Sequence, residues 1–278
     1  MYNWQKQPIK SNLHTHTTFS DGKHSAEEVV LSAIAQGMEV IGFSEHSYNA
    51  NPAVYGMKDI QTVEAYRAEI GRLQNVYGDR IRILLGIEQD SFGTYEPKNY
   101  DYVIGSVHYV YAGGEYCPVD HSRAAMEKAV EEHFGGDIYR YIAAYYEQVA
   151  LMGEKMNCDI IGHFDLVTKF NEGMCMFDEN SPRYLKPAVE ALDFLIEKGF
   201  VLEVNTGAIS RGYRKNPYPS MPLLRRISEQ NGKLTVNSDS HHKDHLMFDF
   251  ERTAAILNLF GLGRVLTMTP TGWKWIYV

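Results

Sequence analysis

The strongest constraint on the fold is an alternation that runs along most of the 278-residue chain. Short apolar runs are each followed by a polar cluster and then by a longer amphipathic stretch. Runs this short and this rich in β-branched residues are typical of buried parallel strands, although periodicity alone does not prove it. The runs are residues 40–43, 83–87, 102–105, 160–162, 200–202 and 234–236, with a further one at 265–268.

The amphipathic stretches between these runs predict helices. Ser25 and Glu28 match a capping box, and Gly37 and Gly199 stand where a helix-ending glycine belongs. Regular alternation predicts an α/β fold in which helices cover a parallel sheet. Seven or eight strands in one domain of residues 1–278 favour a closed or nearly closed β/α barrel, and a doubly wound open sheet is the alternative. The predicted helices are residues 25–36, 59–77, 138–156, 182–198 and 222–230.

The composition argues against several classes of function. The net charge is -8 and no basic block is present, which disfavours a nucleic-acid-binding protein. No apolar run approaches the roughly 20 residues that span a bilayer, and residues 1–10 contain no apolar leader stretch. Cys117, Cys158 and Cys175 form no CxxC pair, so we expect no disulfide framework and a cytoplasmic location.

Histidines and carboxylates follow the apolar runs, where a β/α barrel places its catalytic face. Alternate residues of a strand point the same way, so the pair in His14-Thr15-His16 can bind one ion. A lone histidine at a strand end is more often structural, but their joint placement predicts a metal-dependent hydrolase. Imidazoles and carboxylates without thiolates suit Zn²⁺, Mn²⁺ or Fe²⁺. The residues are His14, His16, Asp21, His46, Glu88, His108, His163, Asp239 and His241.

Seven short motifs carry these residues in a fixed order. They are HTHTTFSDG at residues 14–22, SEHS at 44–47, GIEQD at 86–90, SVH at 106–108, GHFD at 162–165, EVNT at 203–206 and NSDSHH at 237–242. In this order the motifs resemble the polymerase-and-histidinol-phosphatase (PHP) superfamily. The resemblance implies a distorted, TIM-like (β/α)7 barrel that holds three divalent metal ions (Zn, Mn or Fe) at the C-terminal ends of its strands.

The family pattern also implies a division of the ligands among the ions. Carried over by position, it places His14, His16, Glu88 and Asp239 on one ion, His108 and His163 with a bridging Glu88 on the second, and Asp21, His46 and His241 on the third. Bridged ions lower the pKa of a shared water enough to make hydroxide near neutral pH, and they neutralise phosphoryl oxygens. In this scheme Glu88, Asp239 and His241 are catalytic, and the last two are candidates for passing a proton to the leaving alkoxide.

Within the superfamily, the chain is most similar to the histidinol-phosphate phosphatase branch. The chain length, the aspartate at position 21 and the segment RGYRKNPYPS at 211–220 carry this similarity. It implies hydrolysis of a small phosphorylated substrate, L-histidinol phosphate, in histidine biosynthesis. Three alternatives stay open: another small phosphomonoester or a nucleotide-derived phosphodiester, a catalytically silent metal-binding module, and a non-phosphate amidohydrolase.

Four further residues are candidate substrate contacts. Arg211 and Arg214 follow a predicted strand, and a guanidinium fork matches two phosphoryl oxygens, although a solvated basic loop fits the same residues. Lys169 is a second candidate for binding phosphate. Asp120 lies in a long segment expected to be a loop and could pair with an amine of the substrate. The sequence leaves the metal identities and the oligomeric state open.

Overall fold

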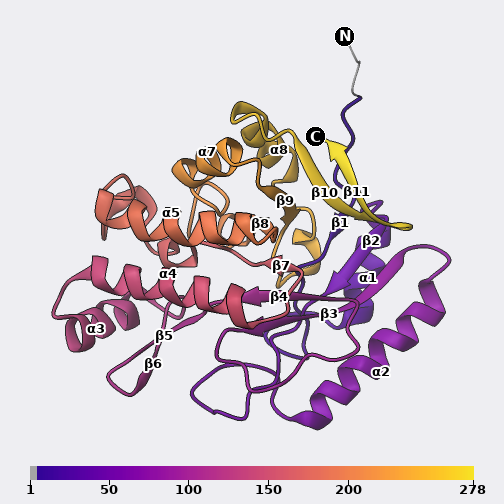
Figure 1. The fold of residues 1–278 in the computed structure, drawn as a ribbon. Helices are drawn as coiled ribbons and strands as arrows, with labels where there is room; N and C mark the ends of the chain where they lie inside the picture. Colours follow the sequence, from indigo (N-terminus) through magenta and orange to yellow (C-terminus); the bar gives the residue numbers. More distant parts are fainter. Residues whose placement is uncertain (1–4) are drawn as a thin grey trace.

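The computed structural model describes residues 5–278, and its central feature is a seven-stranded parallel sheet curved into a nearly closed barrel (Figure 1). Residues 1–4, on which part of the leader-sequence expectation rests, lie outside the described residues. In sheet order the strands are β1 (Ser11–Asn12), β2 (Val40–Phe43), β3 (Arg82–Asp90), β4 (Tyr102–Ser106), β7 (Ile160–Ile161), β8 (Val201–Asn205) and β9 (Lys233–Asn237). The predicted barrel is confirmed, and six of the predicted runs supply its strands β2, β3, β4, β7, β8 and β9.

The barrel closes between the segments that follow β1 and β9. Thr15 and Ser240 form a parallel bridge. The amide of His16 donates to the carbonyl of Ser240 at 2.9 Å, and the amide of Ser240 donates to the carbonyl of His14 at 3.0 Å. The first and last barrel strands are therefore joined at their C-terminal ends.

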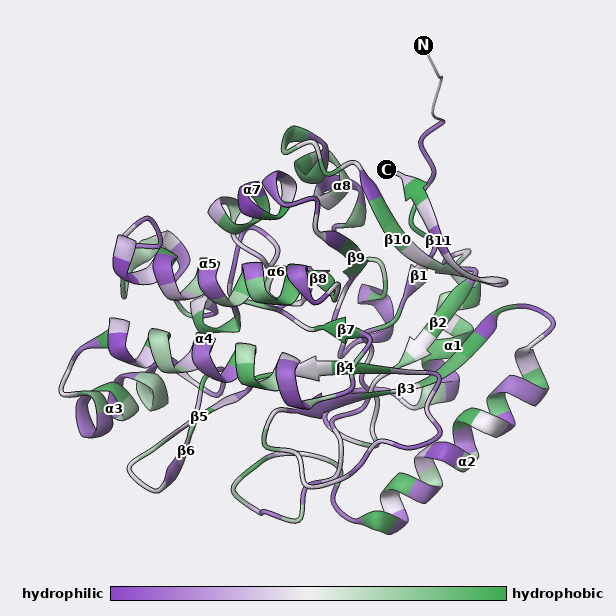
Figure 2. Ribbon diagram, viewed as in Figure 1, coloured by the Kyte–Doolittle hydropathy of each residue, from purple (hydrophilic) through white to green (hydrophobic). Residues whose placement is uncertain are grey.

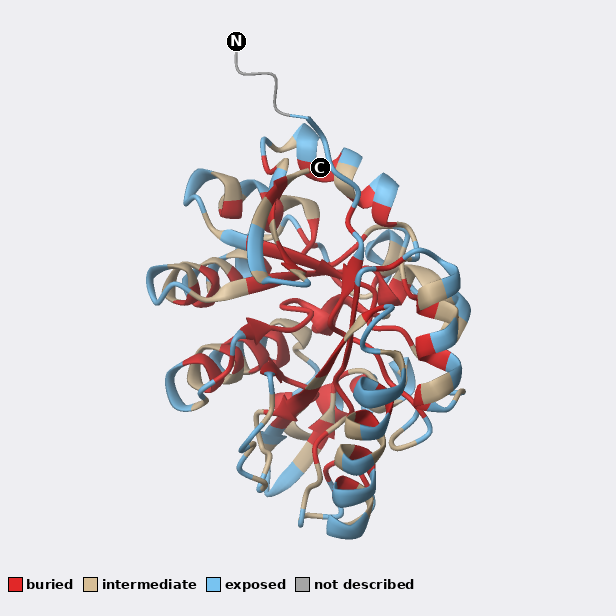
Figure 3. Ribbon diagram, turned by 90° about the vertical axis from the view of Figure 1, so that its right-hand side faces the viewer, coloured by how far each residue is buried: buried red, intermediate tan, exposed pale blue. Residues whose placement is uncertain are grey.

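Helices cover the outside of the barrel, with buried strands at its centre and exposed residues on the outer helical faces (Figures 1 and 3). Figure 2 shows the matching alternation of apolar and polar residues around helices such as α2. The capping box at Ser25 is present, and Gly37 and Gly199 have the expected positive φ of 74° and 83°. Within residues 5–278, no helix is both long and apolar enough to cross a membrane. The predicted helices correspond to α1 (Ala26–Ala35), α2 (Ile60–Tyr77), α4 (Ile138–Lys155), α5 (Pro182–Glu197) and α7 (Met221–Glu229).

Two hairpins depart from the predicted alternation. The run at 265–268 is a strand, β10 (Arg264–Thr269), but it pairs antiparallel with β11 (Gly272–Tyr277), so the prediction of a parallel strand is wrong there. The sequence pattern of an apolar run is the same in a parallel and an antiparallel strand, and only the neighbouring strand determines which of the two it forms. The segment after His108 is a hairpin of β5 (Tyr109–Ala112) and β6 (Glu115–Pro118) rather than a loop. Additional helical segments are α3 (Arg123–Phe134), α6 (Gly207–Ser210), α8 (Phe250–Leu259) and the 3-10 turns at 166–168, 172–174 and 243–245.

The ring of Tyr102 fills the interior of the barrel. Its hydroxyl donates to the carbonyls of Leu13 and Phe43. A Cβ atom at Gly42 would lie 2.4 Å from the Tyr102 hydroxyl, and one at Gly86 would lie 2.2 Å from its Cζ. Two neighbouring strands therefore need glycine to make room for one ring. The interior cluster consists of Leu13, Val40, Leu84, Tyr102, Ile104, Ile160 and Met268.

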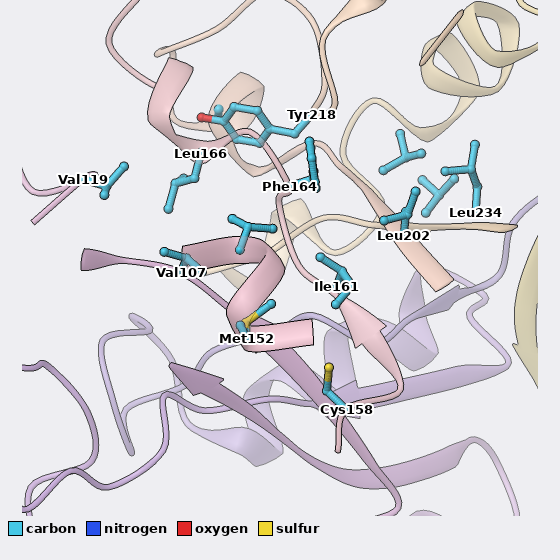
Figure 4. Close-up of a cluster of buried hydrophobic side chains, with 14 of the residues drawn as sticks. Val107, Val119, Met152, Cys158, Ile161, Phe164, Leu166, Leu202, Tyr218 and Leu234 are labelled. Carbon is cyan, nitrogen blue, oxygen red and sulfur yellow. The ribbon is translucent and has the colours of Figure 1, made fainter. Parts of the chain in front are cut away.

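A second apolar layer lies between the strands and the covering helices. Figure 4 shows Met152 of α4 close to Cys158, which precedes β7, and to Ile161 of β7; all three are buried. A Cβ atom at Gly105 of β4 would lie 2.8 Å from the sulfur of Cys158, so glycine permits this close approach. The cysteines 117, 158 and 175 are all unpaired thiols, as expected.

We predict that Gly86→Ala destabilises the fold by about 1–3 kcal/mol, because the added methyl group overpacks the space held by Tyr102. Urea unfolding measures the effect, and adding Tyr102→Leu should make the double variant more stable than the sum of the single effects implies. Gly71→Ala is the matched control, because Gly71 lies in α2 and a Cβ atom there would meet no other atom within 4 Å. Equal losses in the free energy of unfolding for Gly86→Ala and Gly71→Ala would refute this account of the barrel interior.

Candidate metal centre

The nine histidines and carboxylates singled out in the sequence come together at the C-terminal ends of the barrel strands. Glu88 lies within β3, and the other eight lie in segments that follow β1, β2, β4, β7 and β9. Their donor atoms form four overlapping groups, and in each group these atoms lie within 4.8 Å of one another. The groups are His16–Asp21–His46–His241, His14–His16–Asp239, His14–Glu88–His163 and His46–Glu88–His108.

Glu88 lies at the centre of the cluster and is 1% exposed. Its Oε1 is 3.0 Å from Nε2 of His163 and 3.4 Å from Nε2 of both His14 and His108. Its Oε2 is 3.0 Å from Nδ1 of His46. The two oxygens of one carboxylate therefore face different histidines, so Glu88 can bridge two neighbouring ions.

Asp239 and Asp21 extend the cluster toward the surface. Asp239 Oδ1 is 3.4 Å from Nε2 of His16, and the backbone of Asp239 has a φ of 46°, a left-handed conformation that aspartate tolerates better than most residues. Asp21 Oδ2 is 3.1 Å from Nε2 of His241 and 3.7 Å from Nε2 of His46. The His16 ring contacts those of His46 and His241 at centroid distances of 4.5 and 4.3 Å.

The hydrogen bonding of the cluster fits a divalent cation. Nε2 of His14 and both ring nitrogens of His16 are buried and have no hydrogen-bond partner among residues 5–278. Buried polar atoms are nearly always paired, so unpaired imidazole nitrogens that face carboxylate oxygens call for a missing positive partner. Imidazole and carboxylate ligands suit Zn²⁺, Mn²⁺ or Fe²⁺.

Charges within the cluster shift the pKa values of its members in opposite directions. Burial alone would raise the pKa of Glu88, but the rings of His14 and His46 outweigh it and hold that pKa well below its usual range. Burial, reinforced by His241 and His46, lowers the pKa of His16 to about 3, so this ring is neutral near pH 7 and can donate a lone pair. Burial opposes the charged form of His14 as well, yet Glu203 and Glu88 raise its pKa well above the usual value. Metal binding would therefore displace a proton from His14.

Glu45 holds the loop that carries Asp21. Its Oε1 accepts from the amide of Thr17 at 2.8 Å and from the hydroxyl of the same residue, and its Oε2 accepts from the Ser20 hydroxyl. Burial raises the pKa of Glu45 to about 7, although these hydrogen bonds oppose the shift. Gly22 completes the turn, because a Cβ there would lie 2.3 Å from the carbonyl oxygen of His16.

Of the two candidate arginines, only Arg211 contacts the cluster. Its Nη1 donates to the carbonyl of Asp239 at 3.0 Å, its Nη2 donates to Oδ2 of that residue at 2.9 Å, and Nη1 lies 2.9 Å from Nδ1 of His241. The guanidinium of Arg214 instead pairs with the buried Glu179 at 2.7 and 3.1 Å and donates to the carbonyl of Thr168.

Lys169 and Asp120 contact each other. The Lys169 ammonium donates to the backbone carbonyl of Asp120 at 2.8 Å and to its Oδ2 at 3.2 Å. Burial would raise the pKa of Asp120, but Lys169 and then His108 lower it. The same ammonium is 5.0 Å from the ring centroid of Tyr213.

Two carboxylates to which the sequence analysis assigned no role contact ring nitrogens of the cluster. Asp90 Oδ2 accepts from the amide of His108 at 3.0 Å and lies 3.1 Å from its Nδ1. Glu203 Oε1 lies 2.8 Å from Nδ1 of His14. Both residues belong to the seven motifs, but their histidine partners are 18 and 189 positions away in the chain.

Comparisons with known proteins agree with this architecture. A family model for the PHP domain matches residues 12–207. A curated relative from Deinococcus radiodurans is 30% identical over 92% of this chain and 95% of its own length. Another from Schizosaccharomyces pombe is 27% identical over 92% of this chain and 87% of its own length. Both relatives are named "Probable histidinol-phosphatase".

Two solved structures share the fold. A Listeria monocytogenes protein described as a histidinol phosphatase superposes with a TM-score of 0.72 at 20% identity, over 87% of this chain and 99% of that one. Histidinol phosphate phosphatase from Lactococcus lactis, solved with Zn, L-histidinol and phosphate, gives a TM-score of 0.65 at 21% identity, over 96% and 99%.

Proposed function

The chain belongs to the PHP domain family, and from this membership we propose that it is a metal-dependent phosphomonoesterase that hydrolyses L-histidinol phosphate in histidine biosynthesis. One observation carries the proposal: buried, unpaired histidine nitrogens face Glu88 and Asp239, directly beside the guanidinium of Arg211. Divalent metal ions held by these ligands, together with an arginine, would suit the negative charge of a phosphoryl group. The names of the curated relatives support the substrate.

We propose that the site holds three divalent ions of Zn, Mn or Fe. His14, His16, Glu88 and Asp239 would hold one ion, Glu88, His108 and His163 a second, and Asp21, His46 and His241 a third. The overlap of the four ligand groups supports several neighbouring ions, because His14, His16, His46 and Glu88 each belong to two groups. Bound there, the ions would neutralise phosphoryl oxygens and make an attacking water more acidic.

The side chains around the ions have separate tasks. Arg211 would bind phosphoryl oxygens, because its fork lies beside the cluster and its Nε has no partner among the described residues. Asp239 and His241 are the groups we propose to pass a proton to the leaving alkoxide. Both contact Arg211, so they would lie beside the phosphoryl group that Arg211 binds. Arg214 would hold the loop in place through Glu179 and act on phosphate only indirectly.

We propose that Asp120 and Lys169 bind the organic part of the substrate. The Asp120 side chain is 32% exposed, and its side-chain hydrogen bond to Lys169 uses Oδ2. Its other oxygen can then accept from the amine that histidinol carries. The unpaired thiols of the chain support a reducing, cytoplasmic setting for this reaction.

Elemental analysis should find three divalent ions per chain in the reconstituted protein. Glu88→Gln should release more metal than His163→Ala does, because Glu88 belongs to two ligand groups and His163 to one. Circular dichroism checks that both variants are folded. Equal metal loss in the two variants would argue against a bridging Glu88, and less than one ion in the reconstituted wild type would end the three-ion proposal.

A panel of phosphate esters tests the substrate. Histidinol phosphate should exceed an aryl phosphate in kcat/KM by about 10- to 100-fold, the value of one or more charge-assisted contacts to its amine. The panel also includes a nucleotide-derived phosphodiester and another amino-alcohol phosphate. Equal rates with histidinol phosphate and the aryl ester would refute the substrate assignment while leaving the phosphatase chemistry intact.

Arg211→Ala should lower kcat/KM about 10- to 100-fold by removing a charge-assisted contact to phosphate. Metal should be retained, because Arg211 binds Oδ2 of Asp239 whereas Oδ1 faces the histidines. Arg211→Lys should recover only part of the rate, since an ammonium lacks the bidentate fork. Arg214→Ala is the comparison variant in the same loop. Its loss in free energy of unfolding should exceed the loss of transition-state stabilisation calculated from kcat/KM. The opposite ranking would exchange the roles of the two arginines.

A further inference from the structure

Glu203 of β8 is fully buried and accepts four hydrogen bonds. Its Oε1 accepts from Nδ1 of His14 at 2.8 Å and from Nδ2 of Asn237 at 2.9 Å. Its Oε2 accepts from the backbone amide of His163 at 2.9 Å and from Nδ2 of Asn205 at 2.8 Å. One carboxylate thus joins the ends of four barrel strands.

Two of these donors belong to the same ligand group. His14 and His163 converge with Glu88, and Glu203 fixes the first by its ring and the second by its backbone. A carboxylate can only accept, so a neutral His14 ring must carry its proton on Nδ1. Nε2 then holds the lone pair, and this atom lies 3.4 Å from Glu88 and 3.7 Å from Asp239.

We propose that Glu203 is a positioning residue for the two ions that would share Glu88, because it contacts His14, a proposed ligand of the first ion, and His163, a proposed ligand of the second. It stabilises the Nδ1–H tautomer of His14, in which the lone pair of Nε2 points toward the metal site. It also fixes the backbone of His163 and thereby the position of the His163 ring. Partners of this kind behind a metal-binding histidine typically change metal affinity 10- to 100-fold when removed. The inference rests on the proposed metal centre and is independent of the substrate.

The surroundings of Glu203 require a carboxylate rather than an amide. Asn237 cannot turn its side chain, because its Oδ1 accepts from the amide of Leu13 at 2.8 Å. Asn205 is fixed in the same way by the amide of Gly207 at 2.8 Å. Both oxygens of Glu203 therefore face donors that cannot become acceptors, and an NH₂ group at either place opposes another N–H.

Glutamine at position 203 would act on His14 in particular. If the NH₂ group of the glutamine takes the place of Oε2, it faces two N–H donors that cannot become acceptors. These are the amide of His163 and the side chain of Asn205. If the NH₂ group takes the place of Oε1, it faces Asn237 and His14. His14 can move its proton from Nδ1 to Nε2 and so accept from the NH₂ group. The second arrangement is less costly, and it blocks the nitrogen that faces the metal.

The test measures Zn²⁺ binding to the full-length protein by competition with a chelator. Glu203→Gln should weaken the affinity of one ion about 10- to 100-fold, whereas Glu203→Asp, which keeps an acceptor-only group, should recover part of it. Asp165→Asn is the control for loss of a buried carboxylate. Asp165 is fully buried and accepts from the amide of Ser220 at 2.8 Å, so its replacement should leave zinc affinity unchanged.

Long-range ¹H–¹⁵N NMR of the zinc-loaded wild type gives a readout that needs no variant. Nδ1 of His14 should carry the proton and Nε2 should bind zinc. The inference is overturned if zinc is on Nδ1, or if Glu203→Gln binds zinc as tightly as the wild type. A protein that meets both expectations but does not hydrolyse histidinol phosphate would refute the proposed function and leave the role of Glu203 intact.

Discussion

The contact between the ends of β1 and β9 is the constraint on which the rest of the site depends. Thr15 and Ser240 are paired although 225 positions separate them, and the pairing places His14 and His16 beside Asp239. In an open sheet these two edges would lie on opposite sides, and the ligand group shared by the first and last strands could not form. Closure of the barrel and formation of the site are thus one event.

This closure gathers like-charged groups in a place where water cannot screen them. Glu88, Glu203 and Asp239 are each at most 5% exposed, and histidine rings or Arg211 are their main counter-charges. Buried ionised carboxylates are costly unless they are paired, so this end of the barrel would be a poor choice for stability alone. The apolar cluster around Tyr102 fills another part of the interior and contributes the burial that the polar end lacks. Apolar burial elsewhere in the barrel therefore offsets the cost of the buried charges at the site.

Strand positions and the residues at strand ends were predictable because both depend on local pattern. Glu88 and His163 could be placed from the apolar runs before them, since parallel strands bring their C-terminal ends to one edge. The β5–β6 hairpin was missed, although Gly113 and Gly114 between two aromatic segments are a recognisable turn signal. The role of Glu203 could not be predicted, because its partners come from four different strands and only the closed barrel brings them together. The same reason applies to Arg214, whose partner Glu179 lies on a separate segment.

The arrangement separates chemistry from recognition. Apart from Asp21, which lies on a loop held by Glu45, the candidate metal ligands lie on barrel strands or within a few residues of their ends, where hydrogen bonds between strands limit their movement. The candidate substrate contacts instead come from longer connections: Asp120 follows the β5–β6 hairpin, Lys169 follows a 3-10 turn, and Arg211 follows the short helix α6. Connections tolerate sequence change better than barrel strands do. In a site built this way, changes at connection residues such as Asp120 can alter substrate recognition while the cluster around Glu88 stays the same.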